Sequence, residues 1–419
     1  MAHLQRILCL IGILLSLGLA PVKAADGAKP KVRAITAFIT IDAKGYASQI
    51  EDAVKSLNQL REAVTAAGYE VAGIRISTQP FPEYTRGMKR AEALTLLGTI
   101  NDLSAKLHFA PNIGPAMLKD DDGGEAVELL TEVLSRPGNH LNANLVTAGA
   151  DGIHWNAVRQ AARVIRTVGE RSPYGQGNFN FAAIAMLKPY GPFYPGAWHG
   201  GGTTRHFAIG LESANVVMDV FAREHDPRTV GKVLTEALTV HLRAVEGVAK
   251  KWAAGSGWIY EGMDPTPAPG GEVSIGRAIE SFIGGAFGGP GTETASGIIT
   301  RAVQATPVKQ TGYSGLMIPV LEDAVLTQRW TEGTYSLDSI LAYSAVCAGG
   351  VDTVPLAGDT SEDTIARIIG DVATLAFRWN KPLAVRLLPS PGKKTGDVTE
   401  FSGMLSNAVI QPLVGSVRK

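Results

Sequence analysis

Apolar residues near the N-terminus follow two different periods. The run from Ile35 to Asp42 is apolar and β-branched, which predicts a buried strand. In the next stretch the apolar positions are spaced by three and four residues, as on one face of a helix; they are Ile50, Val54, Leu57, Leu60 and Val64. Ser48 followed by Glu51 predicts a capping box for this helix. Val71 to Ile76 is again strand-like, so the pattern predicts a βαβ unit.

The same alternation continues along the chain. Amphipathic spacing predicts helices over Val230 to Trp252 and Glu362 to Trp379. Further strand-like runs are Leu107 to Pro111, Leu141 to Thr147, Phe179 to Leu187, His206 to Leu211, Trp258 to Met263, Gly315 to Val320, Val351 to Leu356 and Leu383 to Leu388. Apolar strands separated by amphipathic helices predict a largely parallel sheet covered by helices. An open doubly wound sheet and a closed barrel both fit this pattern.

The first 24 residues are typical of a secretory signal peptide. Arg6 precedes a charge-free, mostly apolar run from Ile7 to Ala20, and Val22 and Ala24 occupy the positions that a signal peptidase recognises. The apolar run is shorter than the roughly 20 residues of a spanning helix, so a permanent anchor is the weaker alternative. We expect a soluble exported, periplasmic protein, with residues 25 to 419 as its single domain and no stable membrane insertion.

Composition narrows the classes of partner. The 419 residues include 39 Lys plus Arg and 39 Asp plus Glu, so no basic field is present to attract nucleic acid. Cys9 lies inside the predicted signal peptide. Cys347 is then the only cysteine of the mature chain, and an internal disulfide is excluded.

Several strings of the sequence resemble one known family. They are PFPEY at Pro80 to Tyr84, FAIGLESANVV at Phe207 to Val217, MDPTPAP at Met263 to Pro269, GYSGLMIPVLED at Gly312 to Asp323 and CAGGVDTVPLAGD at Cys347 to Asp359. Together they resemble domain-of-unknown-function family 711, which is similar in fold to pyruvate formate-lyase. The resemblance implies an α/β fold in which a ten-stranded barrel is formed by two five-stranded halves that run antiparallel to each other.

The fold relatives use cysteines at the barrel centre, which makes Cys347 a candidate nucleophile. The sequence places it at the end of an apolar, helical stretch before Gly349 and Gly350, and a helix C-terminus raises a thiol pKa. A buried packing role is the alternative. A glycyl radical is not expected, because the C-terminal tail lacks the arginine-valine-x-glycine-aromatic pattern.

Glycines and lysines offer a second type of candidate. Phe282 to Glu293 is glycine-rich, and its Gly288, Gly289 and Gly291 precede a helix whose free N–H groups could hold a phosphate or carboxylate. Tight turns between helices are the alternative. Lys393 could supply positive charge for an anionic substrate, or be a solvated surface lysine.

Carboxylates at strand ends are the most promising candidates, because ligands of α/β folds gather where strands end. The full set is Asp42, Glu212, Asp264, Glu322, Asp323 and Asp359, of which Asp323 and Asp359 also fit a helix N-cap. Glu212 and Asp264 are favoured because they lie inside the matching strings. His199 is retained as a proton donor or acceptor. The histidines show no metal-ligand spacing, and no metal site and no cofactor are assigned.

Two classes of function remain open. One is an enzyme that acts on a small polar or anionic metabolite through these carboxylates, His199 or Cys347. The other is a non-catalytic periplasmic binding or scaffolding protein. A deep pocket with convergent ionisable groups favours the enzyme, and an interior filled by side chains favours the second class. The oligomeric state is not predicted.

Overall fold

The computed structural model describes residues 28–121, 123–413 and 415, and the predicted signal peptide lies outside them. Its strands are β1 (Lys31–Ile39), β2 (Ile74–Thr78), β3 (Ala110–Met117), β4 (Asn142–Gly149), β5 (Gly152–Ile153), β6 (Phe181–Ala185), β7 (His206–Glu212), β8 (Ile259–Asp264), β9 (Gly350–Ala357) and β10 (Leu383–Ser390). They form one ten-stranded mixed sheet, so the fold is α/β as predicted.

Helices separate most of the strands along the chain. They are α1 (Tyr46–Ala66), α2 (Phe81–Thr85), α3 (Arg90–Leu107), α4 (Gly124–Leu134), α5 (Trp155–Arg171), the 3₁₀ helix η1 (Pro173–Asn180), α6 (Ala214–Phe221), α7 (Val230–Ser256), α8 (Ile275–Ile283), α9 (Thr292–Gln304), α10 (Ala324–Glu332), α11 (Leu337–Tyr343) and α12 (Glu362–Trp379). Within the described ranges, none of them is both long and apolar enough to cross a membrane.

The sheet order is β8-β7-β1-β2-β3-β4-β6-β10-β9, with β5 paired to β4. Strands β1, β2, β3, β4 and β6 are parallel to one another, and both flanking pairs, β7 with β8 and β10 with β9, run antiparallel to them. The sheet therefore has one set of five parallel strands, as the resemblance implies, but the strands of opposite direction form two separate pairs at its edges.

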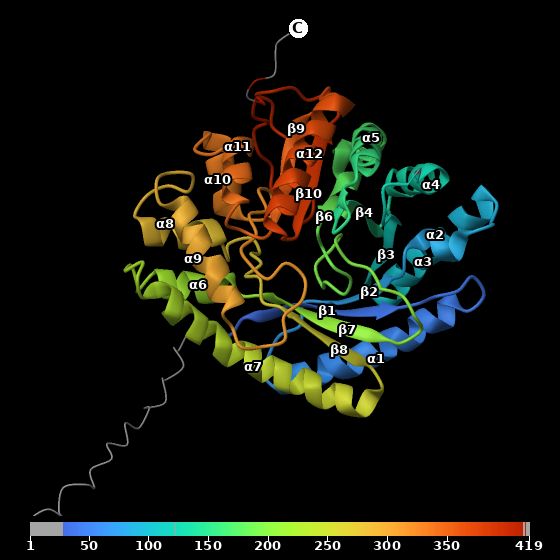
Figure 1. Ribbon diagram of the computed structural model, residues 1–419, viewed down its shortest axis with the longest axis horizontal. Coiled ribbons are helices and arrows are strands. Elements are labelled where there is room, and N and C mark those ends of the chain that lie inside the picture. Colours follow the sequence, from blue (N-terminus) through green and yellow to red (C-terminus); the bar gives the residue numbers. More distant parts are fainter. Residues whose placement is uncertain (1–27, 122, 414, 416–419) are drawn as a thin grey trace, which may run out of the picture.

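Helices lie on the outer side of the curved sheet, with α1 and α7 outside β1, β7 and β8, and α5 and α12 outside β6 and β10 (Figure 1). Strand residues alternate between the two sides. In β1, Ile35 and Ala37 belong to the apolar core under the helices, whereas Phe38 packs in a separate inner cluster. The sheet is thus buried on both faces, which explains its continuous apolar runs.

The connection from β6 to β7, residues 186–205, fills the inner side of the sheet and is called the interior loop. Its Pro192 carbonyl accepts hydrogen bonds from Thr36 Oγ1 and Arg75 Nη1, both at 3.1 Å. The Pro195 carbonyl accepts from the Nδ2 atoms of Asn112 and Asn144, both at 2.8 Å. Buried polar side chains need such partners, so inward-facing residues of the sheet fix the loop in place.

Residues 309–320 differ from the sequence prediction. Gly315 to Val320 is not a strand; the segment is extended and meets the sheet only at its two ends, through single parallel bridges from Gln310 to Met263 of β8 and from Pro319 to Asp352 of β9. The strand prediction over Gly315 to Val320 is therefore wrong, because a turn whose Tyr313 and Ser314 N–H groups donate to Asp264 replaces regular strand pairing between the ends.

Two predicted helix ends also differ from the structure. Helix α1 starts at Tyr46 with Gly45 as its N-cap, and Ser48 Oγ donates to the Gly45 carbonyl, so the predicted capping box at Ser48 and Glu51 is wrong. Gly349 and Gly350 are not a helix C-cap either. Helix α11 already ends at Tyr343, and Gly350 begins β9.

Candidate functional site

A cavity of about 190 Å³ opens on the inner side of the sheet and is called the inner pocket. It lies near the N-terminal ends of β1, β2, β3 and β4, and Asp352 of β9 and Arg386 of β10 also line it. Its lining comprises Arg33, Arg75, Ala110, Asn142, Phe179, Asn180, Phe193, Tyr194, Ala268, Pro269, Met317, Pro319, Glu322, Asp352, Arg386 and Met404. A small cavity with convergent charged groups is the usual form of a ligand site.

Three strands each place one arginine in this lining. Arg33 belongs to β1, Arg75 to β2 and Arg386 to β10, and all three strands are otherwise mostly apolar and buried. Arginine is rarely buried unless it is paired, so its position inside such strands indicates a specific role.

Two of the arginines belong to a chain of ion pairs. Arg33 Nη1 contacts Glu212 Oε2 at 2.9 Å, and its Nη2 lies 3.9 Å from Glu322 Oε2. Arg386 Nη2 donates to Glu322 Oε1 at 2.5 Å, and Arg386 also binds both carboxylate oxygens of Asp352. Burial lowers the pKa of Arg386, but the carboxylates of Asp352 and Glu322 outweigh burial and raise it above its usual value. These two arginines are thus neutralised within the pocket wall.

Arg75 differs from the other two because it forms no ion pair with any carboxylate that the structure describes. Its guanidinium donates to the Pro192 carbonyl and lies over the ring of Tyr194, 4.8 Å from the ring centroid. Burial and the positive charge of Arg33 lower the pKa of Arg75 to about 10. Arg75 remains charged at neutral pH, and this charge has a carbonyl and an aromatic face as partners but no anion.

A larger groove of about 900 Å³ adjoins the inner pocket. Both cavities are lined by Ala110, Phe179, Asn180 and Met404. Met404 is 59% exposed, so this shared wall reaches the molecular surface. The groove therefore offers a route from solvent to the arginines.

Asp264, one of the two favoured carboxylates, is fully buried and lies outside this pocket lining. Its oxygens accept from Thr266 N at 3.0 Å, Thr266 Oγ1 at 2.5 Å, Tyr313 N at 2.7 Å and Ser314 N at 3.0 Å. Burial raises the pKa of Asp264 to about 6, although these four hydrogen bonds lower it. Asp264 therefore joins β8 to the turn at Tyr313.

The turn requires a glycine next to this carboxylate. Gly312 has a φ of +72°, and a Cβ atom there would lie 2.3 Å from Asp264 Oδ2. The strings MDPTPAP and GYSGLMIPVLED thus meet in one hydrogen-bonded clasp.

Glu212 and His199 lie at opposite ends of β7. Glu212 ends the strand opposite Lys31 of β1, whereas His206, near His199, begins it opposite Phe38. At about 3.3 Å per residue the two ends are roughly 20 Å apart. Glu212 borders the inner pocket through its ion pair with Arg33. His199 therefore lies far from Glu212, although both were candidates from the sequence.

His199 is held within the interior loop. Its Nδ1 accepts from Gly201 N at 3.0 Å, so its Nε2 donates to the Thr204 carbonyl at 2.8 Å. Burial lowers the pKa of His199, which favours this neutral form. With both ring nitrogens occupied, His199 stabilises the loop conformation.

The remaining sequence candidates also lie outside the inner pocket. Gly288 N donates to Thr292 Oγ1, and a Cβ atom at Gly288 would lie 2.3 Å from the Thr334 carbonyl oxygen, so the loop of Gly288, Gly289 and Gly291 makes a close turn. Lys393 pairs with Glu400 at 2.7 Å.

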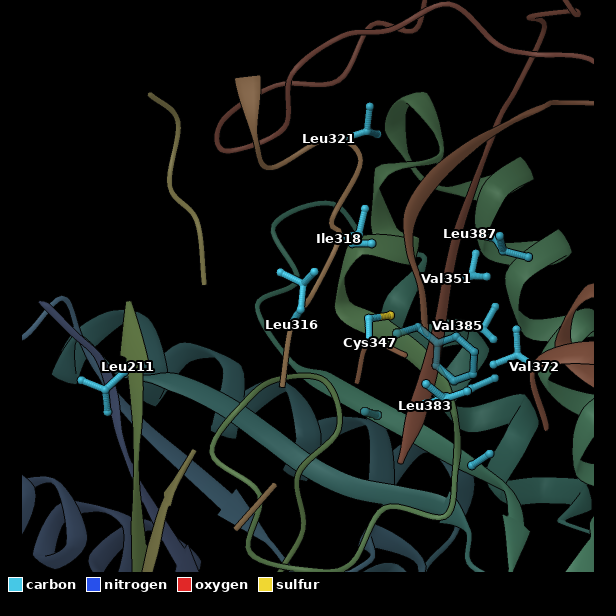
Figure 2. Packing of buried hydrophobic residues seen from close by; sticks show 14 of the residues in the cluster. Leu211, Leu316, Ile318, Leu321, Cys347, Val351, Val372, Leu383, Val385 and Leu387 are labelled. Carbon is cyan, nitrogen blue, oxygen red and sulfur yellow. The ribbon is translucent and has the colours of Figure 1, made fainter. Parts of the chain in front are cut away.

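Cys347 is a buried member of the apolar core between sheet and helices. It lies among Leu316, Ile318, Val351 and Leu383 (Figure 2). Its thiol therefore does not face the inner pocket, and its surroundings match the packing role.

Asp323 has the structural role that the sequence allowed. Its carboxylate caps α10 through Val325 N and Leu326 N, and also accepts from Ile275 N at the start of α8. Asp359, in contrast, is not a cap, because Ser361 is the N-cap of α12. Across the described part of the chain, no group of three His, Cys, Asp or Glu side chains could hold a metal ion.

Sequence reasoning named Glu322 on position but missed Arg33, Arg75, Arg386 and Asp352. One signal was available. The strings KVRAI, IRIST and AVRLL each place a single arginine within an apolar strand, and three such strands predict a shared interior charge site.

Comparison with known proteins identifies similar chains. The family model described as "Uncharacterised ACR (DUF711)" matches residues 25–403. A UPF0210 protein of Pyrobaculum arsenaticum is 30% identical over 389 residues, covering 88% of this chain and 85% of the relative. A UPF0210 protein of Desulforudis audaxviator is 30% identical over 360 residues, covering 82% and 79%.

Among solved structures, the anaerobic ribonucleotide reductase of Thermotoga maritima in complex with dATP and CTP aligns with a TM-score of 0.40 and 9% identity. The alignment covers 85% of this chain and 75% of that one.

Proposed function

On the premise that the chain belongs to the uncharacterised DUF711 family, we propose that it binds a small anionic metabolite in the inner pocket, with Arg75 as the group that holds the anion. The observation that carries the proposal is the half-buried guanidinium of Arg75, which forms no ion pair with any carboxylate among the described residues. Placing an unpaired charge at low dielectric is costly, and a bound anion offsets that cost.

Acid–base chemistry on the bound anion is the enzymatic form of this proposal. Glu322 is its proton acceptor, since it lines the pocket and its Oε2 atom has only the distant contact with Arg33. Neither Cys347 nor a glycyl radical is required. The non-catalytic alternative is favoured by a different observation: the other pocket carboxylate, Asp352, is fully engaged by Arg386.

Thermal unfolding with acetate, butyrate, phosphate and chloride at matched ionic strength tests the binding site. At least one anion should raise the midpoint of the wild-type protein, by an amount that grows with concentration, because a ligand of the folded state stabilises it. Arg75→Gln should abolish this shift. Arg90→Gln is the matched control, since Arg90 pairs on the surface with Glu132 and lies outside the pocket. Equal shifts in the wild type and Arg75→Gln, or no shift in the wild type, would overturn the proposal.

Turnover is tested separately by NMR in D2O, with the stabilising anion as probe. Deuterium incorporation that Glu322→Gln removes, while the thermal shift persists, supports the enzyme. Binding without any incorporation in the wild type supports the non-catalytic alternative.

We also propose that the sheet is closed into a ten-stranded barrel by residues 309–320. The support is at the two ends of that segment: Thr311 N donates to the Met263 carbonyl at 3.0 Å, and Val320 N donates to the Asp352 carbonyl at 3.1 Å. Slow amide hydrogen exchange at Thr311 and Val320 is the expected result. Rapid exchange at both would argue for an open sheet.

Export and a single mature domain from residue 25 belong to the same proposal. They are supported by the charge and apolar pattern of residues 1–24, and the family match begins at residue 25.

A further inference from the structure

The charges around the inner pocket are not evenly distributed. The chain Glu212, Arg33, Glu322, Arg386 and Asp352 contains three carboxylates and two guanidinium groups, so it carries one net negative charge. Arg75 stands outside this chain and supplies one positive charge. The pocket is therefore neutral as a whole, but its positive and negative charges occupy separate positions.

The hydrogen bonds show which carboxylate oxygen of the pocket can still accept a donor from a ligand. Both carboxylate oxygens of Asp352 accept from Arg386, and Glu322 Oε1 accepts from Arg386 Nη2. Glu322 Oε2 accepts no hydrogen bond from the described residues, and Arg33 Nη2 lies 3.9 Å from it, beyond hydrogen-bond distance. Glu322 Oε2 thus retains acceptor capacity in the pocket wall, which it shares with Arg75.

A ligand that carries only negative or only positive charge can pair with Arg75 or with Glu322, but not with both. A carboxylate bound to Arg75 leaves Glu322 Oε2 without a donor and adds a negative charge beside Glu322 and Asp352. A dianion such as phosphate adds two. A molecule with a carboxylate and an ammonium group keeps the pocket neutral and supplies a partner to each position.

The other side chains that line the pocket indicate which kind of ligand body would fit between the two charged groups. Phe193 and Tyr194 come from the interior loop, and Met317 and Pro319 come from the segment 309–320. These side chains form apolar walls around a volume of about 190 Å³, which suits a short aliphatic chain or a small ring.

We infer that the inner pocket binds a small zwitterionic aminocarboxylate with an apolar body, its carboxylate on Arg75 and its ammonium on Glu322. This inference rests on the proposed function, because it takes the Arg75 anion site as given. It adds the requirement for an amino group, which anion binding alone does not make.

Isothermal titration calorimetry with three probes of equal carbon length tests the inference. The probes are butyrate, butylamine and 2-aminobutyrate, titrated into the full chain at pH 7 and matched ionic strength. We expect 2-aminobutyrate to bind at least about tenfold more tightly than butyrate, because an added charged hydrogen bond contributes about one tenfold step or more. Butylamine should bind most weakly, since it leaves Arg75 unpaired.

Two variants separate the possible failures. Glu322→Gln should bind butyrate and 2-aminobutyrate equally, and butyrate at least as tightly as the wild type does, because a negative charge beside the bound carboxylate is removed. Arg75→Gln should lose both. If butyrate binds through Arg75 but the amino group adds nothing in the wild type, the inference fails and the proposed anion site stands. If no probe depends on Arg75, the proposed function fails as well. The wild-type comparison alone decides the inference should Glu322→Gln not fold.

Discussion

The ion pairs of Arg386 give a sharp prediction of stability. The Arg386→Met substitution keeps a side chain of similar length but leaves Asp352, which is 2% exposed, as a buried carboxylate without a cation. Glu322 loses its 2.5 Å hydrogen bond at the same time. Removing one partner of a buried pair typically costs about 3 to 5 kcal/mol, and we expect the free energy of unfolding to fall by this amount.

A second variant tests whether the loss of unfolding free energy comes from the unpaired charge of Asp352. Adding Asp352→Asn to Arg386→Met removes that charge, so the double variant should recover about 1 to 3 kcal/mol relative to the sum of the single changes. Urea denaturation with linear extrapolation measures all three free energies. Arg90→Met is the control, because its exposed pairs should be worth less than about 1 kcal/mol. If Arg386→Met costs no more than this control, or if the two changes simply add, the reasoning about the network is refuted.

Three further predictions concern other residues. The pKa of Asp264 is raised to about 6 by burial, so its ionisation should lower the unfolding free energy by about 2 kcal/mol as the pH rises from 4 to 7. Asp264→Asn should flatten this part of the urea-derived pH profile, and parallel profiles would contradict it. Cys347→Ala should cost about 1 to 2 kcal/mol in urea and leave butyrate affinity unchanged; loss of binding in a folded variant would make the thiol functional. Mass spectrometry of the protein expressed in its native host should find Ala25 at the N-terminus, and intact Met1 on a cytosolic protein would oppose export.

Much of the fold could be predicted from the sequence because each periodic segment carries its own signal. Helix α12 has the predicted bounds Glu362–Trp379, and the predicted helix from Val230 lies within α7. The segment 315–320 is apolar like a strand, but its pairing depends on the clasp between Asp264 and the turn at Tyr313, and no local pattern encodes that contact. The predicted strand from Leu107 to Pro111 began too early, because Leu107 is the last residue of helix α3 and strand β3 begins at Ala110.

The site was harder to predict because its partners are distant in sequence. Arg386 meets Asp352 across 34 residues and Glu322 across 64. The predicted strand end that selected Glu322 does not exist, and position alone could not distinguish Glu322 from Asp264, whose carboxylate already accepts four hydrogen bonds. Only the tertiary arrangement reveals which oxygens remain available to a ligand.

The order in which the chain is synthesised affects how the interior loop reaches its position. The side chains that hold its Pro192 and Pro195 carbonyls come from β1 to β4, and all of them precede the loop along the chain. These strands are synthesised before the loop, so the side chains that hold its carbonyl groups are already present when the loop is made. Strands β7 to β10 follow and enclose it. Purified chains truncated after the loop should therefore already protect the first half from protease, and the pocket is complete only in chains that include Arg386.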